Sequence, residues 1–154
     1  MRPHFRFEDL EIWQLARNLA AKLHLLADEL DKKRLYRYAE QLRAAGLSLT
    51  NNIAEGSGST HSKEFQQFLN ISRRSLFEDA SMLLVFETLG LLSRVEVDGL
   101  LSDCDTLSRK ITNFKDASHL ALALCPLPLC PSAPLPLCPS ALGLNNPQPL
   151  QAIV

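Results

Sequence analysis

The sequence predicts an all-α protein: an antiparallel up-and-down four-helix bundle followed by a disordered C-terminal tail rich in proline, leucine and cysteine. Apolar residues recur at three- and four-residue intervals over most of the first 119 positions, without strand-like alternation. Short polar segments divide this pattern into four runs, and short links favour antiparallel neighbours. Eight of the nine prolines lie beyond residue 123, where they disfavour both helix and sheet. We therefore assign residues 1–119 to the bundle and residues 120–154 to a low-complexity tail.

The first two helices are predicted from apolar runs at residues 10–30 and 35–53. Within each run apolar residues recur every three or four positions, which indicates an amphipathic helix. Gly56 and Gly58 follow the second run and are expected to end that helix.

The third helix is expected to begin in the hydroxyl-rich segment 59–62 and to stop near Gly90. The fourth opens with Ser93-Arg-Val-Glu96, the spacing of a capping box, in which serine and glutamate each accept the other's exposed backbone N–H. Its apolar run then extends to Phe114.

The tail repeats the eight residues PLPLCPSA at 126–133 and 134–141. Such a segment is typical of an extended chain with no packed core of its own. The N-terminus carries acidic residues where a signal peptide needs an apolar run, and prolines interrupt the long uncharged stretch. We expect a cytoplasmic protein that neither spans nor binds a membrane.

The second and third helices are expected to pair as a hairpin about Ser59. A register in which facing residue numbers sum to about 118 joins apolar residues and places one small residue against another. Its pairs are Ile53 with Phe65, Leu49 with Leu69, Leu42 with Leu76, Leu35 with Leu83, and Gly46 with Ser72.

Polar residues accompany this hairpin along one flank of the second helix and within the apolar stripe of the third. A carboxylate in the stripe needs a partner, because burying an isolated charge is costly. We expect Asp79 to pair with Arg43 or the Tyr38 hydroxyl. The predicted structural polar network comprises Gln41, Arg43, Ser48, Asn52, Glu55 and Asp79.

The formal net charge of −1 hides a segregated pattern, +5 over residues 32–75 and −4 over residues 76–119. Clustered cations on one surface suffice for phosphate contacts. The other interpretation is a solvated face, or a partner for the acidic fourth helix. The candidate nucleic-acid face comprises Lys32, Lys33, Arg34, Arg37, Arg43, Lys63, Arg73 and Arg74.

The second helix also carries small and apolar residues opposite its core stripe, where a monomer should show mostly charge. A helix that is apolar on both sides is usually buried on both sides, so this face predicts self-association. It comprises Ala44, Leu47, Asn51 and Ala54.

No catalytic, cofactor-binding or metal-binding constellation is predicted. The four histidines are scattered, and no CxxC pair or metal-binding histidine spacing occurs. The glycine-rich turn from Gly56 to Lys63 offers an alternative function, a small anion- or nucleotide-binding protein, because free N–H groups at a helix start attract phosphate. Neither nucleotide-binding fingerprint is present.

Three segments resemble a known family: FEDLEIWQLA at 7–16, QLRAAGLSLTNNIAEGSG at 41–58 and KEFQQFLNISRRSLFEDASMLL at 63–84. They are similar to the four-helix-bundle proteins encoded in intervening sequences of 23S ribosomal RNA genes. The same family includes the accessory variability determinant of diversity-generating retroelements. The family's Asn-Ile-Ala-Glu-Gly signature falls on residues 52–56.

The resemblance implies a bundle that assembles into a homopentameric ring and performs no enzymatic reaction. In the retroelement branch it also implies a basic surface for the reverse transcriptase and nucleic acid. A net charge of −1 departs from that strongly basic branch and favours the intervening-sequence type. We expect a non-enzymatic, self-assembling bundle with RNA or a ribonucleoprotein as its candidate partner.

Overall fold

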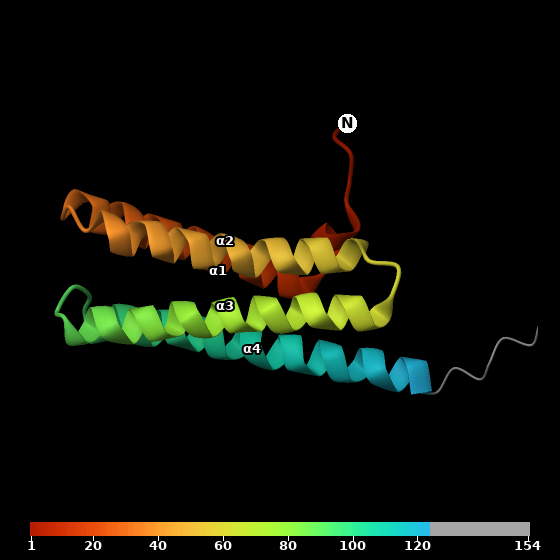
Figure 1. Cartoon of the computed structure of the whole chain (residues 1–154). Coiled ribbons are helices and arrows are strands. Elements are labelled where there is room, and N and C mark those ends of the chain that lie inside the picture. Colours follow the sequence, from red (N-terminus) through yellow and green to blue (C-terminus); the bar gives the residue numbers. More distant parts are fainter. Residues whose placement is uncertain (124–154) are drawn as a thin grey trace, which may run out of the picture. The chain divides into compact units, whose positions relative to one another are not determined.

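In the computed structural model, which describes residues 1–123 with side chains as far as Asp116, four α-helices form an antiparallel up-and-down bundle. A short 3-10 helix, η1 (Arg6–Asp9), precedes α1 (Glu11–Lys32), α2 (Tyr36–Gly58), α3 (Ser62–Thr88) and α4 (Arg94–Ala123). The hairpin of α1 and α2 forms one layer and the hairpin of α3 and α4 the other (Figure 1). No strand occurs within residues 1–123, so the predicted fold class is confirmed.

Each helix buries one stripe of side chains against its two neighbours in the bundle. Burial of these apolar stripes is the main favourable term in folding of the bundle. In α1 the buried stripe is Ile12, Ala16, Leu19, Leu23, Ala27 and Leu30. The opposite faces are polar enough that no helix in the described part of the chain could cross a membrane.

The same turn geometry ends α1 and α3. After α1, Arg34 has a φ of +62°, and the N–H of Leu35 donates to the carbonyl of Leu30 at 3.0 Å. After α3, Gly90 has a φ of +67°, and the N–H of the next residue donates to the carbonyl of Phe86 at 2.9 Å. These are Schellman motifs, whose left-handed position usually holds glycine. At the first turn an arginine occupies that unfavourable conformation.

The fourth helix begins with the predicted capping box. The N–H of Ser93 donates to Glu96 Oε2 at 2.9 Å, and the N–H of Glu96 donates to Ser93 Oγ at 3.4 Å. Hydrogen bonds from Ser93 hold the pKa of Glu96 below its ordinary value. The helix continues to Ala123, so the first four residues assigned to the tail are helical. The disorder predicted from residue 124 onward concerns residues outside the described part.

One pair of the predicted register between α2 and α3, Gly46 with Ser72, is wrong. Ser72 was expected opposite Gly46, but its hydroxyl donates to the carbonyl of Leu49 at 2.8 Å. Gly46 faces α1 instead, where an added Cβ would lie 3.5 Å from Leu23 Cδ1 and 3.7 Å from Ala20. A shift of three residues keeps apolar stripes in contact, since a turn has 3.6 residues. Hydrophobic periodicity alone therefore did not select the register.

Candidate assembly and nucleic-acid surfaces

Part of the predicted polar network joins α2 to α3. The hydroxyls of Ser48 and Ser75 lie 2.9 Å apart, and the Asn52 amide donates to the carbonyl of Ser48 at 2.7 Å. Further along the same flank, the amide of Gln41 donates to Glu78. The Ser48–Ser75 and Gln41–Glu78 bonds bridge the two layers of the bundle, whereas the Asn52 bond lies within α2.

Two members of the predicted network lie elsewhere. Arg43 lies on the α1 side of α2, and its guanidinium donates to Asp28 at 2.5 Å and Asp31 at 2.6 Å. The hydrogen bond with Arg43 holds the pKa of the Asp28 carboxyl below its ordinary value. Glu55 is exposed, and within the described residues its carboxylate takes no part in the bonds that join α2 to α3.

Asp79 does not have the partner that the sequence analysis expected. Arg43 is engaged with α1, and the Tyr38 ring packs on Phe86 with 5.4 Å between centroids. Asp79 is fully buried, and neither carboxyl oxygen has a hydrogen-bond partner among the described residues. Burial, assisted by the charge of Glu78, raises the pKa of Asp79 to about 8. The group therefore holds its proton at neutral pH, which avoids the cost of a buried charge.

Gly56, at the end of the family signature, is required by the packing of α2 on α3. It lies inside α2, which continues to Gly58. An added Cβ at residue 56 would lie 2.6 Å from the side chains of both Phe65 and Phe68. The sequence analysis took this glycine for a helix stop, whereas it permits a close approach between two helices.

The predicted oligomer face borders a groove between α1 and α2. This α1/α2 groove has a volume of about 350 Å³, and Leu47, Asn51 and Ala54 line it together with Phe7, Trp13, Arg17, Ala20, Ala21, His24 and Thr50. The fourth predicted residue, Ala44, is exposed beside it. Leu47 is 56% exposed, a large fraction for a leucine in the middle of a helix. The described residues thus leave the α1/α2 groove open, and its lining is mostly apolar.

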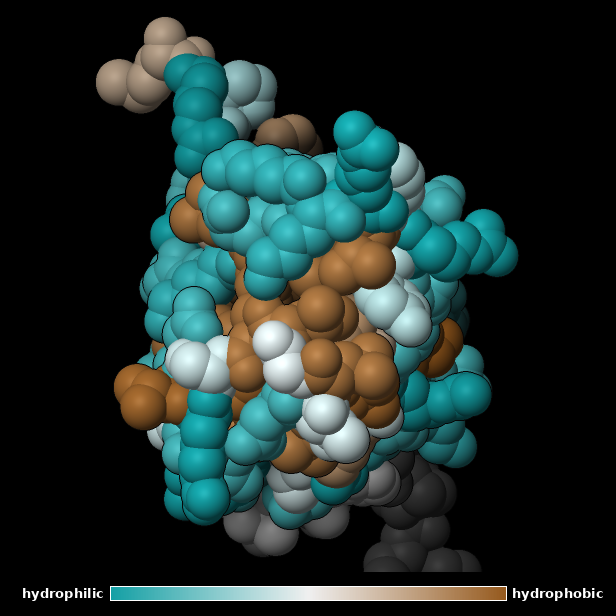
Figure 2. All heavy atoms as spheres, turned by 90° about the vertical axis from the view of Figure 1, so that its left-hand side faces the viewer, coloured by the Kyte–Doolittle hydropathy of each residue, from teal (hydrophilic) through white to brown (hydrophobic). Residues whose placement is uncertain are grey.

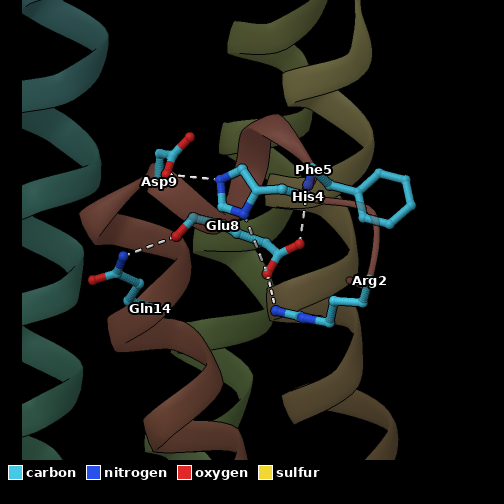
Figure 3. A network of polar contacts seen from close by, with 6 residues as sticks. All are labelled: Arg2, His4, Phe5, Glu8, Asp9 and Gln14. Carbon is cyan, nitrogen blue, oxygen red and sulfur yellow. Dashed lines mark hydrogen bonds and ion pairs between the residues drawn. The ribbon is translucent and has the colours of Figure 1, made fainter.

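The N-terminal segment contributes Phe7 to the lining of the α1/α2 groove. Figure 3 shows Glu8 of η1 receiving Arg2 and the backbone N–H of Phe5, the latter at 3.0 Å. The amide of Gln14 in α1 donates to the Glu8 carbonyl at 2.8 Å. The Phe5 N–H, followed by Arg2, holds the pKa of Glu8 below its ordinary value. These bonds hold η1 against α1. The ring of Phe7, which belongs to η1, packs on the ring of Trp13 with 4.8 Å between their centroids.

The residues of the candidate nucleic-acid face lie in different parts of the bundle. The cations of residues 32–37 surround the α1–α2 turn, whereas Lys63 begins α3 at the opposite end of the bundle (Figure 1). Arg73 is half-buried against the Phe77 ring, and Arg43 is neutralised by α1. The eight residues therefore do not form one continuous basic surface.

Neighbouring groups also engage several cations of the α1–α2 turn. Lys32 pairs with Glu29 at 2.5 Å, and Lys33 Nζ donates to the Leu91 carbonyl at 3.1 Å. Arg37 lies 3.8 Å from Glu40. Figure 2 views this end of the bundle and shows an apolar area bordered by hydrophilic side chains over the two turns. Leu89, directly after α3, is one of the exposed apolar residues of the α3–α4 turn.

The alternative site at the α2–α3 turn is a hollow of about 250 Å³. Its polar lining includes Ser59, Thr60, His61 and Ser62, and Arg6 of η1 also lines it. Lys63 is exposed and does not line the hollow. No side chain caps the start of α3, so its first N–H groups are open to an anion.

Comparison with known proteins identifies one family for this chain. No curated protein matches the chain. Residues 8–113, which span the bundle from the end of η1 to near Phe114 in α4, match the family model described as 23S rRNA-intervening sequence protein. That match covers well over half of the 154 residues. The chain therefore belongs to the 23S rRNA-intervening sequence protein family.

Proposed function

We propose that the chain is a non-enzymatic cytoplasmic protein that assembles with copies of itself through the α1/α2 groove and, once assembled, docks on RNA or a ribonucleoprotein. The observation that carries the proposal is the open apolar groove around Leu47. Contiguous exposed apolar surface on a folded protein marks an interaction site.

The geometry of α2 favours a second copy as the occupant of the groove. One side of α2 already packs in the core, and the side bearing Leu47 is apolar as well. A helix that is apolar on two sides is stabilised when both sides are buried, and a second copy would bury the side that bears Leu47. The family resemblance supports a ring of five as the closed form.

Arg34 supports the RNA part of the proposal. Its left-handed conformation costs about 1 kcal/mol relative to glycine, so the turn would be more stable without it. The side chain is exposed and forms no ion pair with the described residues. A residue kept in an unfavourable conformation at a surface suggests a role for its side chain. An assembly of several copies presents several of these cationic turns to one RNA. Binding through several weak sites at once raises the overall affinity.

The assembly is tested by replacing Leu47 with glutamate in the full chain. A charge in the α1/α2 groove should give a folded but smaller species, measured by size-exclusion chromatography with light scattering. Leu25→Glu is the matched control, because Leu25 is 67% exposed on α1 outside the groove. Leu47→Glu with the mass of wild type would reject the groove as the contact.

RNA docking is tested by measuring binding of structured RNA at several salt concentrations. Arg34→Glu should weaken binding and flatten its salt dependence, since each phosphate contact contributes to the slope. Lys63→Glu makes the same charge change at the other end of the bundle and should leave binding nearly unchanged. Salt-insensitive binding by wild type, or no binding at low salt, would reject the RNA part.

An anion- or nucleotide-binding protein is the second candidate, favoured by the presence of Arg6 and His61 at the open start of α3. Isothermal titration with inorganic phosphate and with nucleotides tests it. Saturable binding that Arg6→Ala abolishes, without RNA binding, would replace the first candidate by the second.

A further inference from the structure

We infer that the RNA docked by this protein is single-stranded and that one of its bases stacks on the exposed ring of Tyr36. The inference rests on the proposed RNA docking and names the form of RNA involved. The surface concerned, called here the turn surface, comprises residues 32–37 around the α1–α2 turn and residues 88–93 around the α3–α4 turn. The two turns lie at the same end of the bundle (Figure 1), and Lys33 Nζ joins them by donating to the Leu91 carbonyl at 3.1 Å.

The turn surface offers positive charge to a phosphate. Residues 32–37 include four cations and no acidic residue, and residues 88–93 include no charged residue. Arg34 is exposed and forms no ion pair with the described residues. The carboxylates that pair with Lys32 and Arg37 are themselves largely exposed, so exchanging these partners for a phosphate costs little.

One carboxylate at the start of α4 compensates part of this charge. Hydrogen bonds from Ser93, and then the charge of Lys33, hold the pKa of Glu96 below its ordinary value. The Glu96 carboxylate is bound in the capping box with Ser93. Arg34 therefore remains the unpaired cation of the turn surface among the described residues.

Tyr36 provides an aromatic ring two positions after this cation. It is the first residue of α2 and is 62% exposed. Among the described residues its side chain has no ring contact and no hydrogen bond, whereas the Tyr38 ring packs on Phe86 with 5.4 Å between centroids. Unpaired bases stack on exposed aromatic rings, and cations beside the ring hold the phosphates. The turn surface supplies both parts of such a site.

The distribution of the cations disfavours a duplex as the ligand. An RNA duplex is bound through phosphates and sugars spread along its helix. The cations of this protein do not follow such a path, because Lys63 lies at the opposite end of the bundle and Arg43 is held by carboxylates of α1. A duplex also keeps its bases stacked inside, where Tyr36 cannot reach them. A single strand can bend around one turn and present its bases, so it suits the turn surface better.

The test measures binding of a labelled RNA of about 16 nucleotides to the full-length protein by fluorescence anisotropy. The RNA is used as a single strand and annealed to its complement. Tyr36→Ala removes the ring and Tyr36→Phe keeps it. Phe77→Ala is the matched control, because Phe77 is a 57% exposed ring of α3 outside the turn surface. Circular dichroism checks that the variants fold, and the comparison of the two RNA forms needs only wild type.

We expect wild type to bind the single strand more tightly than the duplex. Tyr36→Ala should weaken binding of the single strand roughly tenfold, as loss of one stacked base predicts. Tyr36→Phe and Phe77→Ala should bind like wild type. Equal affinity for the two RNA forms, or unchanged binding of the single strand by Tyr36→Ala, would show that the inference is wrong although RNA docking stands.

Failure of the proposed RNA docking gives a different result. Wild type that binds neither RNA form at low salt overturns the docking and the inference with it. Vesicles containing phosphatidylserine are titrated in parallel, since cations beside exposed Leu89 also suit an anionic membrane. Binding to the vesicles without binding to RNA would assign the turn surface to a membrane and overturn both.

Discussion

Replacing Asp79 with asparagine or leucine should stabilise the protein, and the gain should grow as the pH rises. Asp79 is fully buried without a hydrogen-bond partner among the described residues, and its pKa is raised from 3.8 to about 8. Between these two values the unfolded carboxyl is ionised while the folded one is protonated. Folding therefore takes up a proton in this range, and the free energy of unfolding of wild type falls as the pH rises.

The size of the effect follows from the two pKa values. Each pH unit between them costs about 1.4 kcal/mol, so the cost is about 2 kcal/mol at pH 5 and about 4 kcal/mol at pH 7. Above pH 8 the cost levels off at about 6 kcal/mol, because both states are then ionised. Asparagine has nearly the same shape and removes the titration. Leucine also removes the unpaired polar group, at a packing cost of about 1–3 kcal/mol.

The assay is urea denaturation at pH 5, 6, 7 and 8, with all proteins at one concentration because assembly adds stability by mass action. The stability difference between Asp79→Asn and wild type should increase by about 3 kcal/mol from pH 5 to pH 7. Glu55→Ala is the control: this exposed carboxylate should change stability by less than about 0.5 kcal/mol at any pH. A pH-independent difference, or an Asp79→Asn protein less stable than wild type at pH 8, would refute the reasoning.

Three further predictions concern local geometry. Gly56→Ala should lower the free energy of unfolding by about 1–3 kcal/mol, because its Cβ has no room beside α3; Gly58→Ala, with open space around it, should not, and thermal melting of the pair decides. Arg34→Gly should raise stability by about 1 kcal/mol while weakening RNA binding, and a loss of stability would contradict the assigned strain. Ser93→Ala removes the capping box and should cost about 1 kcal/mol, whereas Glu96→Gln should cost less; equal melting of Ser93→Ala and wild type would show that the box is not stabilising.

The order of the helices and the start of α4 were predictable because they depend on local chemistry. Apolar periodicity gave four helices in order, and the Ser93–Glu96 spacing gave the capping box that the structure contains. The position of Leu47 and Asn51 on one side of α2 was predictable for the same reason, because helical geometry alone brings them together, and both line the groove.

The interhelical details were not predictable, because several arrangements satisfy the same pattern. Helix periodicity allows more than one register between two apolar stripes, and in the structure Ser72 meets Leu49 rather than Gly46. The predicted ion pair between Arg43 and Asp79 was wrong for a similar reason. Arg43 binds carboxylates of α1, and a prediction based on the hairpin of α2 and α3 alone does not include them. Gly56 reads as a helix stop in sequence, and its role emerges from side chains of another helix.

The central proposal is that the chain works as an assembly of several copies. Light scattering on the purified full-length protein over a hundredfold range of concentration tests it most directly. The account predicts a defined mass that is a multiple of one chain, with five copies expected from the family resemblance. A protein with the mass of one chain at every concentration would contradict the account.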